Sequence, residues 1–219
     1  MSDVSDELKR NLGITTVGDA GVLSSSERTY VVLGVSRGGT SAIAGWLNIL
    51  GVPMGRSGKP PLFEDLRMNR ALAAGIEAAE QQIAENNAEQ PVWGFKGNAI
   101  QQPYGEIARR LRNPVFVVIF RDLLAIANRA RLSASRDVGW ILQKQAQEYA
   151  RIADFVATGG YYSVLLSFEK LNACTEDVLA QFSAALALPM DEAVRERALQ
   201  FIRPAPEDYL RVSKAKKRD

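Results

Sequence analysis

Residues 29–50 read TYVVLGVSRGGTSAIAGWLNIL, and this stretch decides the fold class. Its apolar start is typical of a buried strand and its end is typical of a helix, with a turn of small residues between them. A strand, a Gly-rich turn and a helix start direct unpaired backbone N–H groups and the positive end of the helix dipole toward an anion. The stretch therefore predicts a phosphate-binding loop, and we expect its contacts to come from Arg37, Gly38, Gly39, Thr40 and Ser41.

The glycines have the spacing of a Walker A loop, with four residues between Gly34 and Gly39. The position that holds lysine in that motif is Thr40 here, and the nearby cation is Arg37. The missing lysine weakens an assignment to ATP or GTP, because that lysine reaches the outer phosphates and neutralises charge during transfer. We therefore expect Arg37 to bind an anion of a different shape.

The composition fits one globular domain of 219 residues, with 47% hydrophobic and 24% charged residues. We expect this domain at 29–212, between a polar, partly ordered leader at 1–28 and a basic tail at 213–219. A net charge of +2 is too small to indicate a nucleic-acid partner. The lone Cys174 excludes an internal disulfide, and no apolar run is long enough to span a membrane. We expect a cytoplasmic protein.

Predicted strands alternate with predicted helices along the chain. Strands are expected at 29–35, 92–96, 115–120 and 161–166, and helices at 39–50, 63–88, 103–112, 122–135, 138–158, 175–186 and 191–202. This alternation implies right-handed crossovers and hence an α/β domain of three layers, in which helices flank a central parallel sheet. Ligands of such sheets bind at the carboxyl ends of the strands.

Three cations occupy the ends of predicted strands. Arg37, Lys96 and Arg121 each follow an apolar run. A pattern of solvated surface charge does not explain three cations in equivalent positions. We infer that they converge on one anionic ligand.

The loop sequence R-G-G-T-S after a strand resembles the [KR]-S-G-T-[ST] loop of the sulfotransferases that use 3′-phosphoadenosine 5′-phosphosulfate (PAPS). The resemblance implies a P-loop-type domain in which this loop holds the 5′-phosphosulfate. The segment at 120–129 resembles the family's second motif, an Arg that closes a strand and a Ser eight residues later, both of which bind the 3′-phosphate. Here Arg121 matches, Arg129 stands in place of the Ser, and Ser133 is expected to supply the missing hydroxyl.

Further segments match the same family. Val92–Lys96, VWGFK, is similar to its W-G-x-K strand, and the resemblance implies that Lys96 neutralises the departing oxygen, together with Arg37. The cytosolic branch takes its base from a histidine two residues later, but Asn98 is found there and the chain has no histidine. Glycan-directed members use a glutamate after the loop helix instead, which makes Glu64 the candidate base and Asp65 the next candidate.

Two other sets of residues are assigned structural roles. The segment SFEKL at 167–171 is similar to the family's Y-E-D-L segment, and we expect Glu169 to fix a helix entry or to pair with a basic neighbour. Large aromatic residues belong mostly to the core, with one of them left as a candidate to flank the adenine or the acceptor. These residues are Trp46, Trp93, Tyr104 and Trp140.

The resemblance implies an enzyme that transfers the sulfuryl group of PAPS to a hydroxyl acceptor by in-line displacement, without a metal and with PAP as product. A carbohydrate or a small alcohol is the favoured acceptor, held by the segments 51–63 and 132–157. Two alternatives remain. One is a P-loop kinase or NTPase, in which 117–122 is a strand that ends in a magnesium-binding Asp. The other is a nucleotide-binding protein of sulfotransferase fold that does not catalyse.

Overall fold

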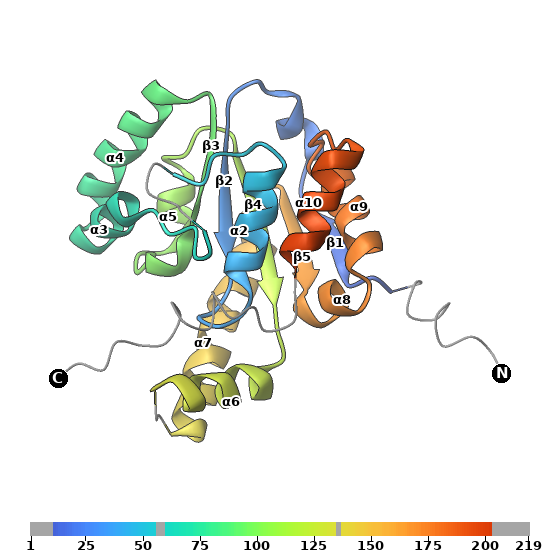
Figure 1. Ribbon diagram of the computed structural model, residues 1–219. Helices are drawn as coiled ribbons and strands as arrows, with labels where there is room; N and C mark the ends of the chain where they lie inside the picture. Colours follow the sequence, from blue (N-terminus) through green and yellow to red (C-terminus); the bar gives the residue numbers. More distant parts are fainter. Residues whose placement is uncertain (1–10, 56–59, 135–136, 203–219) are drawn as a thin grey trace.

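The computed structural model describes residues 11–55, 60–134 and 137–202. In this part of the chain, a five-stranded sheet lies between layers of helices, as Figure 1 shows. The strand order is β1-β5-β4-β2-β3, in which β1 is antiparallel to β5 and the other pairings are parallel. The strands are β1 (Ile14–Val17), β2 (Arg28–Leu33), β3 (Val92–Lys96), β4 (Pro114–Phe120) and β5 (Ser163–Ser167). The predicted α/β class and the helix-flanked central sheet are confirmed.

The central strands are hydrophobic on both faces, as expected for strands covered by helices. In β2, Tyr30 and Val32 pack into one core layer and Val31 and Leu33 into the other. The first layer lies under α2 (Thr40–Ile49), α9 (Thr175–Ala185) and α10 (Glu192–Phe201). The second lies under α3 (Leu66–Ala74), α4 (Ile76–Glu89), α5 (Tyr104–Ala108) and α7 (Val138–Thr158).

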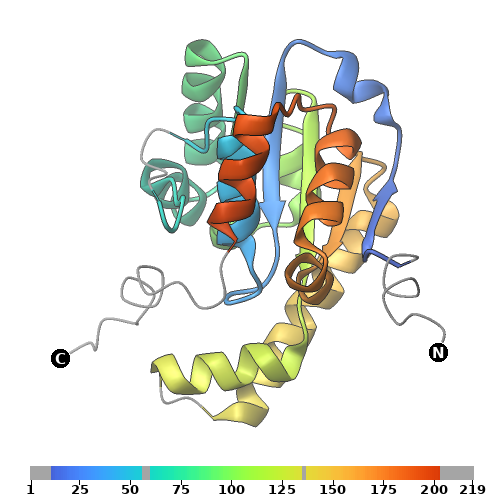
Figure 2. The same cartoon turned by 45° about the vertical axis from the view of Figure 1, so that its right-hand side comes forward.

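The remaining helices lie near the carboxyl ends of the strands. α6 (Leu123–Ala134) and the start of α7 project beyond these ends, as both views of the ribbon show (Figures 1 and 2). The short helix α8 (Phe168–Ala173) directly follows β5, and the 3-10 turn η2 (Gly97–Ala99) directly follows β3. Several elements thus surround one end of the sheet.

The chain changes direction across the sheet at β2. From β2 it passes to β3 on one side, and from β3 it crosses to β4 on the other. In open α/β sheets, ligands bind at the carboxyl ends of the strands beside such a switch point. The loop 34–39 follows β2 and Arg121 follows β4, so the topology brings two of the predicted anion-binding segments to this position.

Several elements differ between the prediction and the structure, among them the helix predicted at 103–112, which ends at Ala108. The sheet begins earlier than residue 29, because β1 and the 3-10 turn η1 (Ala20–Ser24) lie within the predicted leader. The single helix predicted at 63–88 is two helices, because Gly75 has φ 124° and ψ −174° and ends α3. The helix α8 was not predicted. Residues 1–10 of the predicted leader and the predicted tail at 213–219 lie outside the described residues.

A loop covers the outer edge of β3. The N–H of Gly94 donates a hydrogen bond to the carbonyl oxygen of Pro53 at 2.8 Å. A Cβ atom at residue 94 would lie 2.9 Å from the carbonyl oxygen of Tyr30 and 3.0 Å from Sδ of Met54. Glycine therefore permits the close approach of this loop to the strand.

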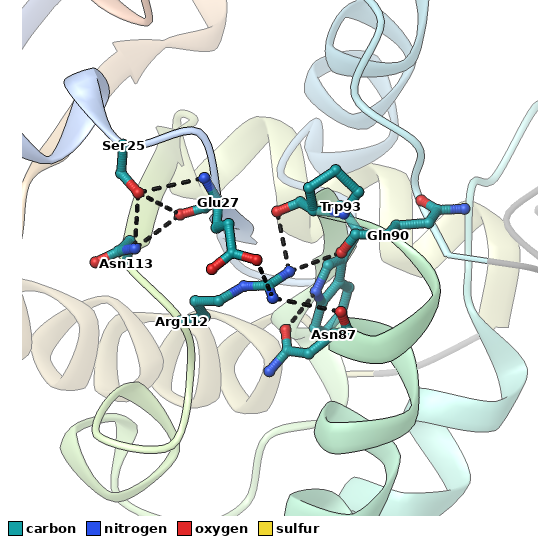
Figure 3. A network of polar contacts seen from close by, with 8 residues as sticks. Ser25, Glu27, Asn87, Gln90, Trp93, Arg112 and Asn113 are labelled. Carbon is teal, nitrogen blue, oxygen red and sulfur yellow. Dashed lines mark hydrogen bonds and ion pairs between the residues drawn. The ribbon is translucent and has the colours of Figure 1, made fainter.

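At the opposite end of the sheet, Arg112 connects the amino ends of β2 and β3 (Figure 3). Its guanidinium donates to the carboxylate of Glu27 at 2.9 Å and to three backbone carbonyl oxygens, those of Asn87, Gln90 and Pro91, at 2.7 to 3.3 Å. Only a side chain with several donors in a fixed plane can bond to so many acceptors at once. Polar contacts of Arg112 therefore hold the amino ends of β2 and β3 together.

We expect Arg112→Ala to lower the free energy of unfolding by about 2–3 kcal/mol, because four acceptors lose a charged donor. Urea unfolding followed by circular dichroism measures the change. Arg109→Ala is the matched control, because Arg109 is exposed and its replacement should change stability by less than about 0.5 kcal/mol. Equal unfolding midpoints for the two variants would contradict a structural role of Arg112.

Candidate anion-binding site

The loop after β2 contains a residue in a strained conformation. Arg37 has φ 68°, a left-handed conformation that costs a residue other than glycine about 1–2 kcal/mol. The N–H of Gly38 donates to the carbonyl oxygen of Val35 at 2.8 Å, and Gly39, with φ 103°, is the N-cap residue of α2. Strained residues other than glycine cluster at functional sites. The conformation thus marks Arg37 as a candidate functional residue.

Arg121 and Phe168 hold this loop from the side of β4 and β5. Nη1 of Arg121 donates to the carbonyl oxygen of Arg37 at 2.9 Å, and the guanidinium lies 4.4 Å from the centroid of the Phe168 ring. The same ring packs against Gly39, where an added Cβ would lie 2.4 Å from it. Arg121 thus supports the loop backbone. Its Nε is buried and has no hydrogen-bond partner among the described residues.

The turn that carries Arg121 is itself fixed by two side chains. The N–H of Arg121 donates to the hydroxyl of Tyr149 at 2.7 Å, and this hydroxyl donates to the carbonyl oxygen of Arg121 at 3.1 Å. Burial raises the pKa of Tyr149 to about 12, so the hydroxyl keeps its proton. The carboxylate of Glu169 accepts from the N–H of Asp122 at 2.9 Å, at the entry to α6. The structural role expected for Glu169 is confirmed.

Lys96 is buried at the end of β3, with 3% of its side chain exposed. Its Nζ donates to the carbonyl oxygen of Leu62 at 2.8 Å, to Oγ of Ser41 at 3.0 Å and to Oε1 of Glu64 at 3.2 Å. These three acceptors match the three protons of an ammonium group. The side chain therefore connects β3, the first turn of α2 and the segment that precedes α3.

Burial makes the charged form of the Lys96 side chain less favourable. Burial lowers the pKa of Lys96, the Glu64 carboxylate opposes part of this effect, and the guanidinium of Arg37 lowers the pKa further. The effect of Arg37 on Lys96 and the bond from Arg121 to Arg37 place the three predicted cations at one corner of the sheet. An anion in this corner would meet a concentrated positive charge.

A cavity of about 630 Å³ opens beside the loop. Residues 34–37 of the loop line one side of it, Glu64 and Asn98 contribute to its lining, and α7 contributes residues from Trp140 to Arg151. The side chain of Glu64 is 39% exposed, although its carboxylate is bonded to Lys96. The candidate base thus has access to the same space as the loop.

The predicted site residues fall into three groups. Arg37 and Glu64 line the cavity. Arg129 lies half-buried on α6 and is not among the lining residues, and the side chain of Ser133 lies outside the described part of the structure. The remaining residues belong to the buried or half-buried surroundings of the loop and do not line the cavity: Gly38, Gly39, Thr40, Ser41, Lys96 and Arg121.

The structure separates the two candidate bases. Asp65 is 2% exposed, and its Oδ1 accepts from the N–H groups of Arg67 at 3.0 Å and Met68 at 3.4 Å, so it is the N-cap of α3. The helix-start role therefore belongs to Asp65. Glu64 precedes the cap, and its carboxylate reaches the cavity instead.

The sequence analysis expected the segment 132–157 beside the acceptor, but it did not single out the residues with which α7 lines the cavity. Trp46, Trp93 and Tyr104 are buried, as expected for most of this set, whereas Trp140 is 47% exposed and lines the cavity, the kind of position that was left open for one of the four. Nζ of Lys144 lies 5.2 Å from the centroid of the Trp140 ring. The available signal was the spacing of four between Trp140, Lys144 and Glu148, which places them on one helix face.

Comparison with known proteins does not assign this site. No protein-family model matches the sequence, and no curated protein matches it. None of the described helices has the length and apolar composition needed to cross a bilayer. Within the described ranges, no group of three or more acidic, thiol or imidazole side chains is arranged to hold a metal ion.

We expect Lys96→Met to be less stable than the wild type at pH 7 by about 1–3 kcal/mol, because Ser41, Leu62 and Glu64 lose a charged donor that methionine cannot replace. The wild type should gain stability relative to this variant as the pH rises toward 10.5, since the folded protein releases the Lys96 proton at lower pH than the unfolded chain does.

Urea unfolding of both proteins between pH 7 and pH 10.5 measures this difference. Equal stability of the two proteins at pH 7 would show that the burial of the ammonium cancels the contribution of its three hydrogen bonds.

Proposed function

We propose that this chain is a PAPS-dependent sulfotransferase with a P-loop-type anion site, which transfers a sulfuryl group to a hydroxyl acceptor. The observation that carries the proposal is the position of Glu64. Glu64 lines the same cavity as Arg37, and Lys96 connects its carboxylate to the first turn of α2. A proton acceptor and an anion-binding loop beside one cavity are what such a transfer needs.

The residues around the loop suit a donor with several negative charges. Arg37, Arg121 and the first-turn amides of α2 would hold these charges. Oγ1 of Thr40 accepts from Nδ2 of Asn98 at 3.3 Å, which leaves its own proton to donate to the ligand. Arg129 and Ser133, carried over from the resemblance, would complete the contacts to the 3′-phosphate.

The proposed reaction is an in-line displacement in which PAPS supplies an electrophilic sulfur. The acceptor oxygen forms a bond to this sulfur while the bond from sulfur to the bridging phosphate oxygen breaks, and PAP is the second product. Glu64 takes the hydroxyl proton of the acceptor, and Lys96 holds the Glu64 carboxylate in place. Arg37 and the start of α2 stabilise the charge on the departing oxygen. Lys96 reaches that oxygen only by exchanging one of its three acceptors.

The kinase alternative is less well supported by the geometry. It requires Asp122, at the end of β4, to bind magnesium. Oδ1 of Asp122 instead accepts from the N–H of Ala125 at 2.7 Å and caps the start of α6. The alternative of a binding protein without turnover shares the same nucleotide site, so only an assay of transfer separates it from the enzyme.

We expect adenosine 3′,5′-bisphosphate to bind at least tenfold more tightly than ATP or GTP, with no requirement for magnesium, as measured by calorimetry. Arg37→Gly should weaken this binding at least tenfold while the loop keeps its conformation, because glycine suits φ 68° and the guanidinium charge is lost. Arg197→Ala, which removes a charge from an exposed position on α10, is the control. Magnesium-dependent ATP binding as the tightest interaction would favour the kinase.

We expect Glu64→Gln to lower the rate of sulfate transfer from PAPS by about 10²–10⁴-fold, because glutamine still accepts from Lys96 but cannot take a proton. Its affinity for adenosine 3′,5′-bisphosphate should stay within about threefold of the wild type, because the charge contacts of the loop are retained. Transfer of radiolabelled sulfate and calorimetry measure the two quantities. Full activity of Glu64→Gln together with an inactive Asp65→Asn would assign the base to Asp65.

A further inference from the structure

A second cavity adjoins the first. It has a volume of about 560 Å³, and its polar lining includes Arg109, Asp154 and Thr158. Gln101 and Arg151 line both cavities, so the two spaces meet at these side chains. We refer to these two neighbouring cavities together as the groove, which starts at the loop and Glu64 and continues past Arg151.

The helix α7 forms one wall of this groove along most of its length. Its lining residues extend from Trp140 through Arg151 to Thr158, a span of about 27 Å at the rise of an α-helix. Tyr149 attaches the same helix to the end of β4 through its hydroxyl, and Ile152 is buried in the core. The wall is thus anchored, and it is longer than a single small acceptor requires.

The side chains along the groove suit a sugar chain. Asn98, Gln101 and Gln145 carry amides, which both donate and accept hydrogen bonds as sugar hydroxyls do. Of the large hydrophobic side chains that the structure describes as exposed, Trp140 alone lines the groove, and it offers an aromatic edge or face against a sugar ring. A phenol or a lipid would require a mainly apolar lining.

The charges along the groove favour an acidic chain. Lys144, Arg151 and Arg109 follow one another from the first cavity to the second. Three carboxylates also line the groove, those of Glu64 and Glu148 in the first cavity and Asp154 in the second, and Glu148 accepts from Arg151 at 2.8 Å and from the hydroxyl of Tyr104. The carboxylate of Glu64, the proposed base, is likewise bonded to Lys96. The four cations that line the two cavities, Arg37, Lys144, Arg151 and Arg109, thus outnumber the three carboxylates by one.

We propose that the acceptor is an acidic oligosaccharide of at least two sugar units, which rests on the sulfotransferase function proposed above. The unit that is sulfated lies in the first cavity, between Glu64 and Trp140, with its negative group near Lys144. The next unit lies in the second cavity, where Arg109 binds its charge. The second cavity thus selects acceptors by length and charge.

Calorimetry in the presence of adenosine 3′,5′-bisphosphate tests this assignment. The probes are glucuronate and unsulfated, glucuronate-containing oligosaccharides of two and four units. We expect the tetrasaccharide to bind at least tenfold more tightly than glucuronate. Arg109→Ala should lower this ratio at least fivefold, whereas Arg197→Ala, which removes the same charge from α10 on the other face of the sheet, should leave the ratio unchanged.

The proposal is overturned if glucuronate and the tetrasaccharide bind equally, if a neutral tetrasaccharide binds as tightly as the acidic one, or if a phenol or an acidic tyrosine peptide binds more tightly than both. Binding is measured without transfer, so the two proposals fail separately. Length-dependent binding without sulfate transfer would support the oligosaccharide site and contradict the sulfotransferase function. Sulfate transfer to sugars that does not depend on their length would support the sulfotransferase function and contradict the oligosaccharide site.

Discussion

The buried ammonium of Lys96 is the constraint on which the arrangement of the site depends. A buried ammonium needs an acceptor for each of its protons, and here the acceptors lie on two other segments, the first turn of α2 and the stretch before α3 that contains Leu62 and Glu64. These segments are far apart along the chain, and the hydrogen bonds of Lys96 fix how close they lie in the fold. The candidate base, the first turn of α2 and the end of β3 are therefore positioned together, and a change in any one of them is felt by the other two.

The elements that the sequence predicts well are those whose signal is local. The bounds of β3 and α7 are as predicted, because each has a hydrophobic pattern with clear ends. The helix predicted at 63–88 breaks at Gly75, whose permissive backbone is a weak signal within an otherwise helical pattern. β1 has four residues, three of them exposed, so it carries no pattern that predicts a strand, and only its pairing with β5 defines it.

The side-chain contacts of the site could likewise be predicted only in part. The topology predicts that Arg37, Lys96 and Arg121 gather at one end of the sheet, because parallel strands present their carboxyl ends together. Which acceptor each cation meets depends on contacts between distant segments. Arg121 bonds to the backbone of the loop because Phe168 lies beneath it, and Glu64 rather than Asp65 reaches the cavity because a helix cap engages its neighbour. No local pattern encodes these choices.

The two margins of the sheet have a consequence for how this protein behaves at high concentration. An unpaired strand margin is a template on which other chains can add strands and aggregate. On one side the margin is β1, which is only four residues long. On the other side, the loop at 51–55 takes up a backbone donor of β3 through the bond from Gly94 to Pro53. Neither margin offers a long, flat row of free backbone groups, so the sheet is protected against intermolecular growth by its own connections.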